Sequence, residues 1–211
     1  MIICRTGRSM NKIKGNVALI FACLIFSHSV FAKTLYYSFD KLSKDRLPKK
    51  MKVLGAKFTS GLEGEGAIEF DGEVQLVYLG PLHIKKSFKV EFSFKAKKIR
   101  ASGYLVDSPS QFSIWLDDRE LKFAVYDLKN GPSVVSLKGV TPYKQRVNVV
   151  ASYNHQKQQV CIGEKGEDAI CISALIKHRV SGSPLYLGQS PRGSHYQSQF
   201  IGILDELRVW H

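Results

Sequence analysis

Residues 88–95 read Phe-Lys-Val-Glu-Phe-Ser-Phe-Lys, with apolar and polar side chains alternating at every position. Because successive side chains of a β-strand point to opposite faces, this period of two predicts a half-buried strand with its four apolar residues toward a core. Similar alternation along the chain predicts more strands at 111–116, 121–126, 146–153, 159–162, 184–187 and 200–210.

Turn-forming residues separate these segments. Polar or Gly- and Pro-containing stretches lie at 117–120, 129–132, 163–168 and 190–193, where such residues favour reversal of the chain. A helical period is weak everywhere and is best approximated at 173–178. Many short strands, regular turns and no alternation of strands with helices predict an all-β fold, a two-sheet antiparallel sandwich.

Three segments carry a resemblance to a known family. Residues 35–40 (LYYSFD), 66–72 (GAIEFDG) and 185–188 (LYLG) followed by 200–210 (FIGILDELRVW) resemble, in order and spacing, the bacterial laminin-G-like domain of the concanavalin A-like lectin/glucanase superfamily. The last motif is the most specific. The resemblance covers nearly all of 33–211 and implies a jelly roll with its first and last strands adjacent. Residues 41–57 depart from it, because a lysine-rich loop replaces the family's small polar loop.

The first 32 residues are typical of a secretory signal peptide. Lys12 and Lys14 form a basic start, 17–27 is an uncharged apolar run, and 30–32 (VFA) is a small-residue cleavage site. Eleven apolar residues are too few to span a bilayer, which needs ~20. We therefore predict cleavage after Ala32 and a periplasmic or secreted protein without a transmembrane helix. An uncleaved anchor and a lipoprotein modified at Cys23 are the alternatives, and either Met1 or Met10 could start the chain.

The charge of the processed chain is strongly basic. Cleavage removes four basic residues and no acidic ones, which lowers the formal net charge from +13 to +9. Residues 33–211 suffice for one domain. Seven basic residues and one acid lie within 41–57. This segment either grips an anionic polysaccharide, a lipopolysaccharide phosphate or a membrane, or is simply solvated. Export argues against nucleic acid as a partner.

Cys161 and Cys171 flank a charged, glycine-containing turn. If 165–167 form the loop, the two cysteines face each other across a hairpin, so a cross-strand disulfide is geometrically reasonable in an oxidising compartment. Two free buried thiols are the alternative.

Glu69, Asp71 and Glu73 match the E-x-D-x-E spacing of retaining glucanases on the same superfamily fold. Alternation would place all three carboxylates on one strand face, with the outer pair as nucleophile and acid/base. Gly72, however, stands where those enzymes carry a bulky apolar residue, and the resemblance already accounts for this segment as a non-catalytic strand. We predict that the protein is not an enzyme, with glycan cleavage as the minor alternative.

The resemblance also implies a structural Ca²⁺ site. Asp40 and Asp205 match the acidic positions near each end of the family's domain, with Asp71 or Glu206 as helpers. Calcium takes six to eight oxygen ligands, so two carboxylates would supply only part of its coordination shell. The alternative is that Asp205 caps a strand bulge or pairs with Arg208.

The candidate ligand-binding residues are aromatic and basic. Trp115 has the opposite parity to Phe112, Ile114 and Leu116, which would place it on the solvent face for stacking on a sugar, although packing in the core is the alternative. The further candidates are Tyr186, Tyr196, Lys49, Lys50 and Lys52. We predict an exported non-catalytic module that binds a carbohydrate or an envelope protein; the alternative is a basic structural protein bound to an anionic partner.

Overall fold

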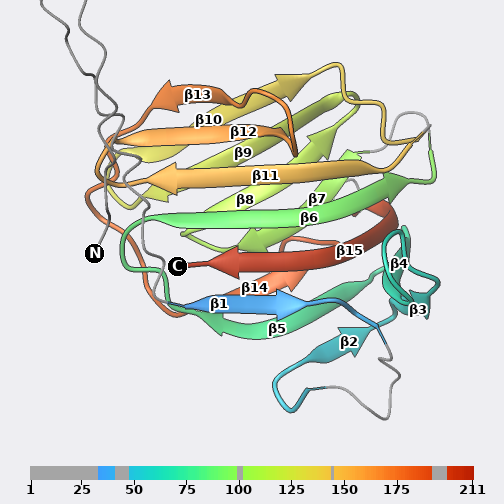
Figure 1. Ribbon diagram of the computed structural model, residues 1–211. Coiled ribbons are helices and arrows are strands. Elements are labelled where there is room, and N and C mark those ends of the chain that lie inside the picture. The colour runs from blue at the N-terminus through green and yellow to red at the C-terminus, as the bar shows by residue number, and fades with distance from the viewer. Residues whose placement is uncertain (1–32, 41–47, 99–101, 144, 192–198) are drawn as a thin grey trace, which may run out of the picture. The chain divides into compact units, whose positions relative to one another are not determined.

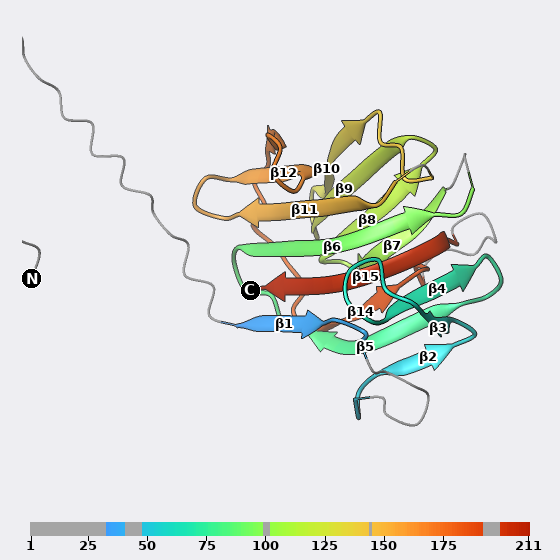
Figure 2. The ribbon, with the colours of Figure 1, turned by 45° about the vertical axis from the view of Figure 1, so that its right-hand side comes forward.

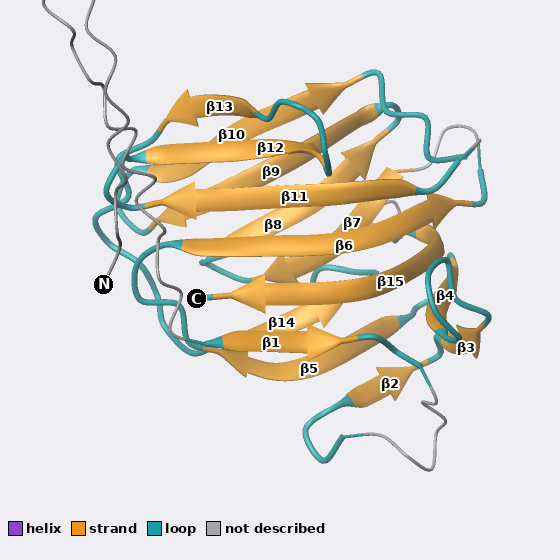
Figure 3. Ribbon diagram, viewed as in Figure 1, coloured by secondary structure: helices purple, strands orange, loops and turns teal. Residues whose placement is uncertain are grey.

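The computed structural model describes residues 33–40, 48–98, 102–143, 145–191 and 199–211. The predicted signal peptide, most of the lysine-rich segment and Tyr196 lie outside these residues. The described residues form strands and loops only (Figure 3). The weak helical period at 173–178 does not produce a helix, since the chain there has no regular structure after Ser173. None of the described elements is an apolar helix of membrane-spanning length.

Two antiparallel sheets make up the fold (Figure 1). Sheet A has eight strands in the order β13-β12-β11-β6-β15-β4-β3, with β1 also paired to β15. Its strands are β1 (Thr34–Tyr37), β3 (Lys57–Thr59), β4 (Ala67–Asp71), β6 (Phe88–Ala96), β11 (Val147–Asn154), β12 (Gln159–Glu164), β13 (Ile170–Ser173) and β15 (Ile201–Trp210). The first and last strands are therefore adjacent, as the family resemblance implied.

Sheet B has seven strands in the order β10-β9-β8-β7-β14-β5-β2. They are β2 (Lys52–Leu54), β5 (Leu76–Leu82), β7 (Ser102–Ser108), β8 (Phe112–Asp117), β9 (Glu120–Asp127), β10 (Gly131–Lys138) and β14 (Ser183–Leu187). Figure 2, turned by 45°, shows this sheet as a second layer behind β11, β6 and β15. The predicted two-sheet antiparallel sandwich is confirmed.

Buried aromatic rings join the two layers. Phe88 of β6 lies with its ring centroid 5.0 Å from that of Phe112 of β8 and 6.0 Å from that of Phe123 of β9. All three rings are fully buried. Because Phe88 belongs to sheet A and the other two belong to sheet B, the alternating pattern at 88–95 supplies side chains to the centre of the core.

The hairpin of β12 and β13 carries the predicted disulfide. Cys161 and Cys171 are direct cross-strand partners with Cα atoms 4.1 Å apart, and their sulfur atoms are bonded. The predicted pairing is therefore confirmed.

Candidate functional site

The outer face of sheet B gathers aromatic side chains from five neighbouring strands. Trp115 is half-buried between the buried Ile114 and Leu116, so it points away from the core. Its cross-strand partner on β7 is Tyr104, with ring centroids 6.0 Å apart. Two residues before Trp115 on the same face, Ser113 pairs with Asp107 of β7.

Asp107 in turn links this group to β14 and β5. Tyr186 of β14 is the cross-strand partner of both Asp107 and Tyr78 of β5. The ring centroids of Tyr186 and Tyr78 are 5.7 Å apart. Cross-strand partners share a face of the sheet, so both tyrosines lie on the same side as Trp115. Tyr126 of β9 joins them through a contact of 3.1 Å between its hydroxyl and that of Ser113. We call Tyr78, Tyr104, Trp115, Tyr126 and Tyr186 the aromatic face.

An irregularity in β7 makes this grouping possible. The register between β7 and β8 shifts between Tyr104 and Val106, where β7 carries one residue more than its partner. Without the extra residue, side chains three positions apart would point to opposite faces. Because of it, Tyr104 and Asp107 both face outward.

A buried carboxylate lies beneath the aromatic face. Asp107 is only 1% exposed. It accepts hydrogen bonds from the hydroxyls of Ser113 and Ser190, the latter at 2.8 Å. Since the Ser113 proton goes to Asp107, the Tyr126 hydroxyl donates to the Ser113 oxygen. This chain of hydrogen bonds fixes Tyr126 relative to Asp107. Burial raises the pKa of Tyr186, so its hydroxyl is protonated and can donate at neutral pH.

The structure brings three of the sequence-predicted ligand residues together. Trp115 and Tyr186 belong to the aromatic face, and Lys52 of β2 is the cross-strand partner of Tyr78. Lys49 and Lys50 lie in the turn that precedes β2. Tyr196 lies outside the described residues.

Sequence reasoning missed Tyr78, Tyr104, Tyr126 and Asp107. Tyr126 had a usable signal, since it lies two positions beyond Ala124 and four beyond Lys122 in a predicted strand, on the polar side of the alternation. Tyr78 lies in an apolar run interrupted by Gly80 and Pro81. That run does not reveal which residues face outward.

The outer face of sheet A is different, because its charged groups satisfy one another. The guanidinium of Arg208 lies 4.5 Å from the ring centroid of Tyr36 and donates to Glu206 at 3.0 Å. The Tyr36 hydroxyl also donates to Glu206, at 2.7 Å, and this hydrogen bond raises the pKa of Tyr36. Lys89 lies 5.0 Å over the ring of Trp210. These contacts make a closed polar network rather than an open platform.

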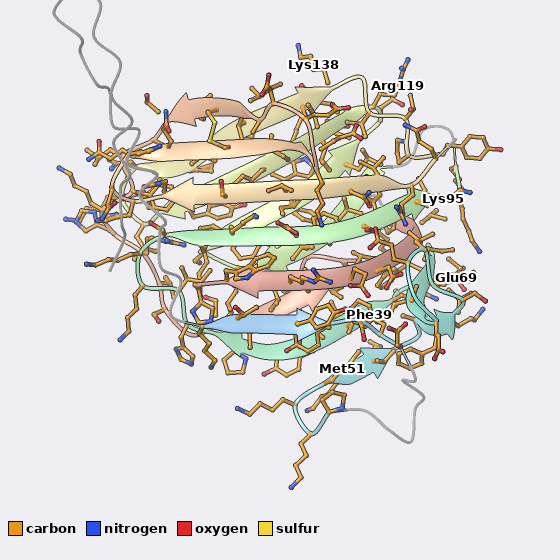
Figure 4. The ribbon with its side chains drawn as sticks, in the orientation of Figure 1. Phe39, Met51, Glu69, Lys95, Arg119 and Lys138 are labelled. Carbon is orange, nitrogen blue, oxygen red and sulfur yellow. A yellow bond between two sulfur atoms is a disulfide. The ribbon has the colours of Figure 1, made fainter. Side chains whose placement is uncertain are left out.

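The E-x-D-x-E carboxylates lie away from the aromatic face. Glu69 and Asp71 share the outer side of β4 in sheet A, and Glu73 follows the strand's last residue, Asp71. Glu69 is ion-paired with Lys97, and Asp71 with Lys57 at 3.3 Å. Figure 4 shows Glu69 near the edge formed by β3 and β4. A backbone N–H from Glu73 lowers the pKa of Asp71. Carboxylates paired with lysines match the stabilisation of a surface strand, and glycan cleavage by Glu69 and Glu73 stays the minor alternative.

Asp40 and Asp205 hold one loop from two sides. The Asp205 carboxylate accepts the backbone N–H groups of Leu62 and Glu63 at 2.9 and 3.0 Å. Asp40 accepts those of Glu65 and Gly66 at 2.6 and 2.7 Å. The two residues predicted as calcium ligands therefore act together on the segment 62–66, which connects β3 to β4.

The donor set around these two residues does not suit calcium. Asp205 accepts a third N–H, from Glu206 at 2.8 Å. An N–H group directed at a carboxylate oxygen occupies the lone pairs that a cation requires. Across the described part of the chain, no group of three or more His, Cys, Asp or Glu residues is arranged to hold a metal ion. Asp40 and Asp205 are therefore arranged to hold the loop at 62–66. Calcium binding stays a prediction.

Comparisons with known proteins find similarity in structure rather than in sequence. No protein-family model matches this chain, and no curated protein matches it significantly. Among solved structures, the binding domain of Paraclostridial Mosquitocidal Protein 1 aligns with a TM-score of 0.57 and 15% identity, over 76% of this chain and 43% of that one. This chain thus spans less than half the length of that domain.

Two further structures are similar over much of their own length. The CBM40 of the Ruminococcus gnavus IT-sialidase, bound to alpha2,3 sialyllactose, has a TM-score of 0.52 and 10% identity, covering 68% of this chain and 88% of that one. The heptameric SAP-like pentraxin from Limulus polyphemus has a TM-score of 0.51 and 18% identity, covering 64% and 68%. At these identities the likeness shows the fold, a jelly-roll sandwich. Membership of the laminin-G-like family stays a prediction.

Proposed function

We propose that this chain is an exported, non-catalytic module that binds a carbohydrate on the aromatic face of sheet B. One observation carries the proposal. Five aromatic side chains from β5, β7, β8, β9 and β14 lie on one solvent-facing surface rather than in the core. Half-buried tyrosines and tryptophans present an apolar ring together with a polar group.

This combination suits a sugar. The apolar C–H faces of a pyranose pack against aromatic rings, while its hydroxyls need a few fixed hydrogen-bonding groups for orientation. Here the tyrosine hydroxyls supply those groups, and the buried Asp107 holds one of them in place through Ser113. Tilted ring contacts of Tyr78 with Tyr186 and of Tyr104 with Trp115 restrict the rings before a ligand arrives, which reduces the entropy cost of binding.

The structural neighbours support a binding module in general. They include a toxin binding domain and a carbohydrate-binding module solved with its sugar. A shared fold does not determine function on a scaffold used so widely, so the aromatic face itself carries the proposal. Export rests on the sequence of residues 1–32 and is tested by locating the protein in the periplasm or medium and sequencing its mature N-terminus.

A glycan-array screen of the protein tests this function. We expect a defined glycan to bind equally well at low and physiological salt, because stacking and neutral hydrogen bonds are little screened. An absence of glycan binding at both salt concentrations would contradict the proposal. Each condition is run with and without calcium, so that a metal requirement is detected in the same experiment.

The basic turn before β2 favours a second candidate function. Lys49, Lys50 and Lys52 are all exposed there, and no carboxylate within the described residues lies within 4 Å of their ammonium groups. Such a group can attract an anionic envelope polymer. Array signals confined to anionic polymers at low salt would favour this function over the carbohydrate module. Hydrolysis of a β-glucan that Glu69→Gln abolishes would favour the enzyme instead.

A further inference from the structure

A separate cleft lies where β1 of sheet A meets β5 of sheet B. It has a volume of about 110 Å³. The apolar side chains among its lining are Leu35, Tyr37, Leu79, Leu82 and Leu185, of which Leu35 and Tyr37 are partly exposed. The buried leucines among them belong to the core of the sandwich. The Tyr37 hydroxyl donates to the carbonyl of Leu79 at 3.2 Å and joins the two sheets beside the cleft.

Two lysines and two histidines lie on the rim of this cleft. Lys33, Lys50, His83 and His211 line it, and none of its lining residues is acidic. Within the described residues, neither lysine has a carboxylate within 4 Å. The stem of Lys50 passes over the backbone of Gly80, since a methyl group built there would lie 3.5 Å from the Lys50 Cβ atom. The Lys50 stem therefore packs against Gly80, which also lines the cleft.

His211 supplies the second, independent observation. Its Nε2 atom is buried and has no hydrogen-bond partner among the described residues. A buried polar atom without a partner carries a desolvation cost that a ligand can relieve. The backbone holds the ring in position, because Lys33 and His211 exchange two N–H···O bonds of 2.9 Å each. Burial, and then the charge of Lys33, lower the pKa of His211, so the ring is neutral at pH 7.

We propose that this cleft binds the anionic head and first methylenes of an amphiphile, with a phosphate or carboxylate at the Lys33–Lys50 rim and the apolar stem against Leu35 and Tyr37. The size agrees with such a segment, since a cavity of ~150 Å³ holds a benzene molecule and this one is somewhat smaller. A purely polar anion would leave the partly exposed Leu35 and Tyr37 without an apolar partner, and a neutral alkyl chain would leave the rim charges unused. The site is independent of the aromatic face.

Titration calorimetry with octyl phosphate tests the proposal, with inorganic phosphate and octanol as separate probes. We expect octyl phosphate to bind the protein at least tenfold more tightly than either probe. The double variant Lys33→Gln/Lys50→Gln should weaken binding at least tenfold. The matched control is Lys85→Gln/Lys86→Gln, which changes two exposed lysines outside the cleft and should change affinity less than twofold.

Nuclear magnetic resonance locates the ligand. We expect octyl phosphate to shift the ring signals of His211 and the methyl signals of Leu185, and to leave Trp115 unchanged. The proposal is overturned by an absence of binding, by inorganic phosphate or octanol binding as tightly as octyl phosphate, or by equal losses in the two double variants. Shifts confined to the aromatic face would also overturn it. Glycan binding by the Lys33→Gln/Lys50→Gln variant is measured as well. It distinguishes a failure of the cleft proposal from a failure of the proposed carbohydrate function.

Discussion

Gly188 shows why the third family-like motif needs its glycine. It follows β14 with a φ of +81°, and a methyl group at this position would lie 2.1 Å from the ring of Phe70. Gly131 has nearly the same φ, +79°, but open space around it. The left-handed conformation costs any other residue roughly 1–2 kcal/mol. Of these two glycines, Gly188 alone adds a collision with a buried ring.

We therefore expect Gly188→Ala to lower the free energy of unfolding by roughly 1–3 kcal/mol more than Gly131→Ala, because overpacking adds to the backbone strain. Urea denaturation of both variants measures this difference. Equal losses would mean that Phe70 does not restrict position 188.

Asp127 is a buried acid whose contribution to the stability of the fold depends on pH. Its carboxylate accepts four backbone N–H groups, from Lys129, Asn130, Lys177 and His178. These hydrogen bonds, that of His178 above all, hold its pKa well below the ordinary value. A carboxyl with a lowered folded-state pKa stabilises the protein above its unfolded pKa of ~3.9, and this stabilisation is lost as the pH falls toward the folded value.

Asp127→Asn should therefore lower the urea midpoint at pH 7, and the gap from the wild type should narrow between pH 5 and pH 2. Asp168→Asn is the matched control, since Asp168 is exposed in the β12–β13 turn, and it should have little effect. A gap for Asp127→Asn that stays constant across this pH range would contradict the assigned role of its charge.

Among the elements, strands with clean alternation were predictable, and irregular strands were not. The predicted segments 88–95, 121–126 and 146–153 correspond to β6, β9 and β11 within one residue at each end. β5 was missed because Gly80 and Pro81 interrupt it, and proline cannot donate to a ladder. β7 was missed because Gly103 and the buried Asp107 break its pattern.

The same irregularities explain how much of the aromatic face could be predicted. Trp115 was predicted to face outward as one of two alternatives, on the parity of a regular strand. Tyr104 could not be paired with it, because that pairing depends on the bulge in β7. Asp107 gave no signal, since a buried carboxylate is recognised by the hydroxyls around it, and Ser190 is 83 residues away in the sequence.

The β12–β13 hairpin gives a prediction about the disulfide. The bond between Cys161 and Cys171 spans a sequence separation of 10. In the chain-entropy model, a loop of this length contributes roughly 2–3 kcal/mol. We expect reduction, or the Cys161→Ser/Cys171→Ser variant, to lower the unfolding free energy by this amount in urea denaturation. A reductant should leave the double variant unchanged; a further loss there would point to a different origin of the effect.

The loop at 62–66 depends on two carboxylates from opposite ends of the sequence. Asp205→Ala leaves three backbone N–H groups without an acceptor, and Asp40→Ala leaves two. We expect each variant to speed amide hydrogen exchange in this loop. The double variant should show non-additive loss of stability, since both residues hold the same segment.

The calcium prediction is tested on the same variants. A calcium-dependent rise in the melting temperature of the wild type that is absent in Asp205→Ala would establish a metal site there. The absence of a calcium-dependent rise in the melting temperature of the wild type would contradict the calcium prediction.

At the scale of the whole molecule, the two outer faces of the sandwich divide its chemistry. Sheet A presents charges that neutralise one another, as in the Tyr36–Glu206–Arg208 group. Sheet B presents aromatic rings held over a buried acid. Each face carries one tryptophan, Trp210 on sheet A and Trp115 on sheet B. Removing each tryptophan in turn therefore compares the loss of the same residue type on the two opposite faces.

The aromatic face of sheet B is the proposed carbohydrate site. The most direct test is the affinity of the best array glycan for the wild type, Trp115→Ala and Trp210→Ala, measured by titration calorimetry at physiological salt. We predict that Trp115→Ala weakens binding at least tenfold, which corresponds to about 1.4 kcal/mol, while Trp210→Ala changes it less than twofold. Unchanged binding by Trp115→Ala, or a larger loss in Trp210→Ala, would contradict the assignment of the site to sheet B.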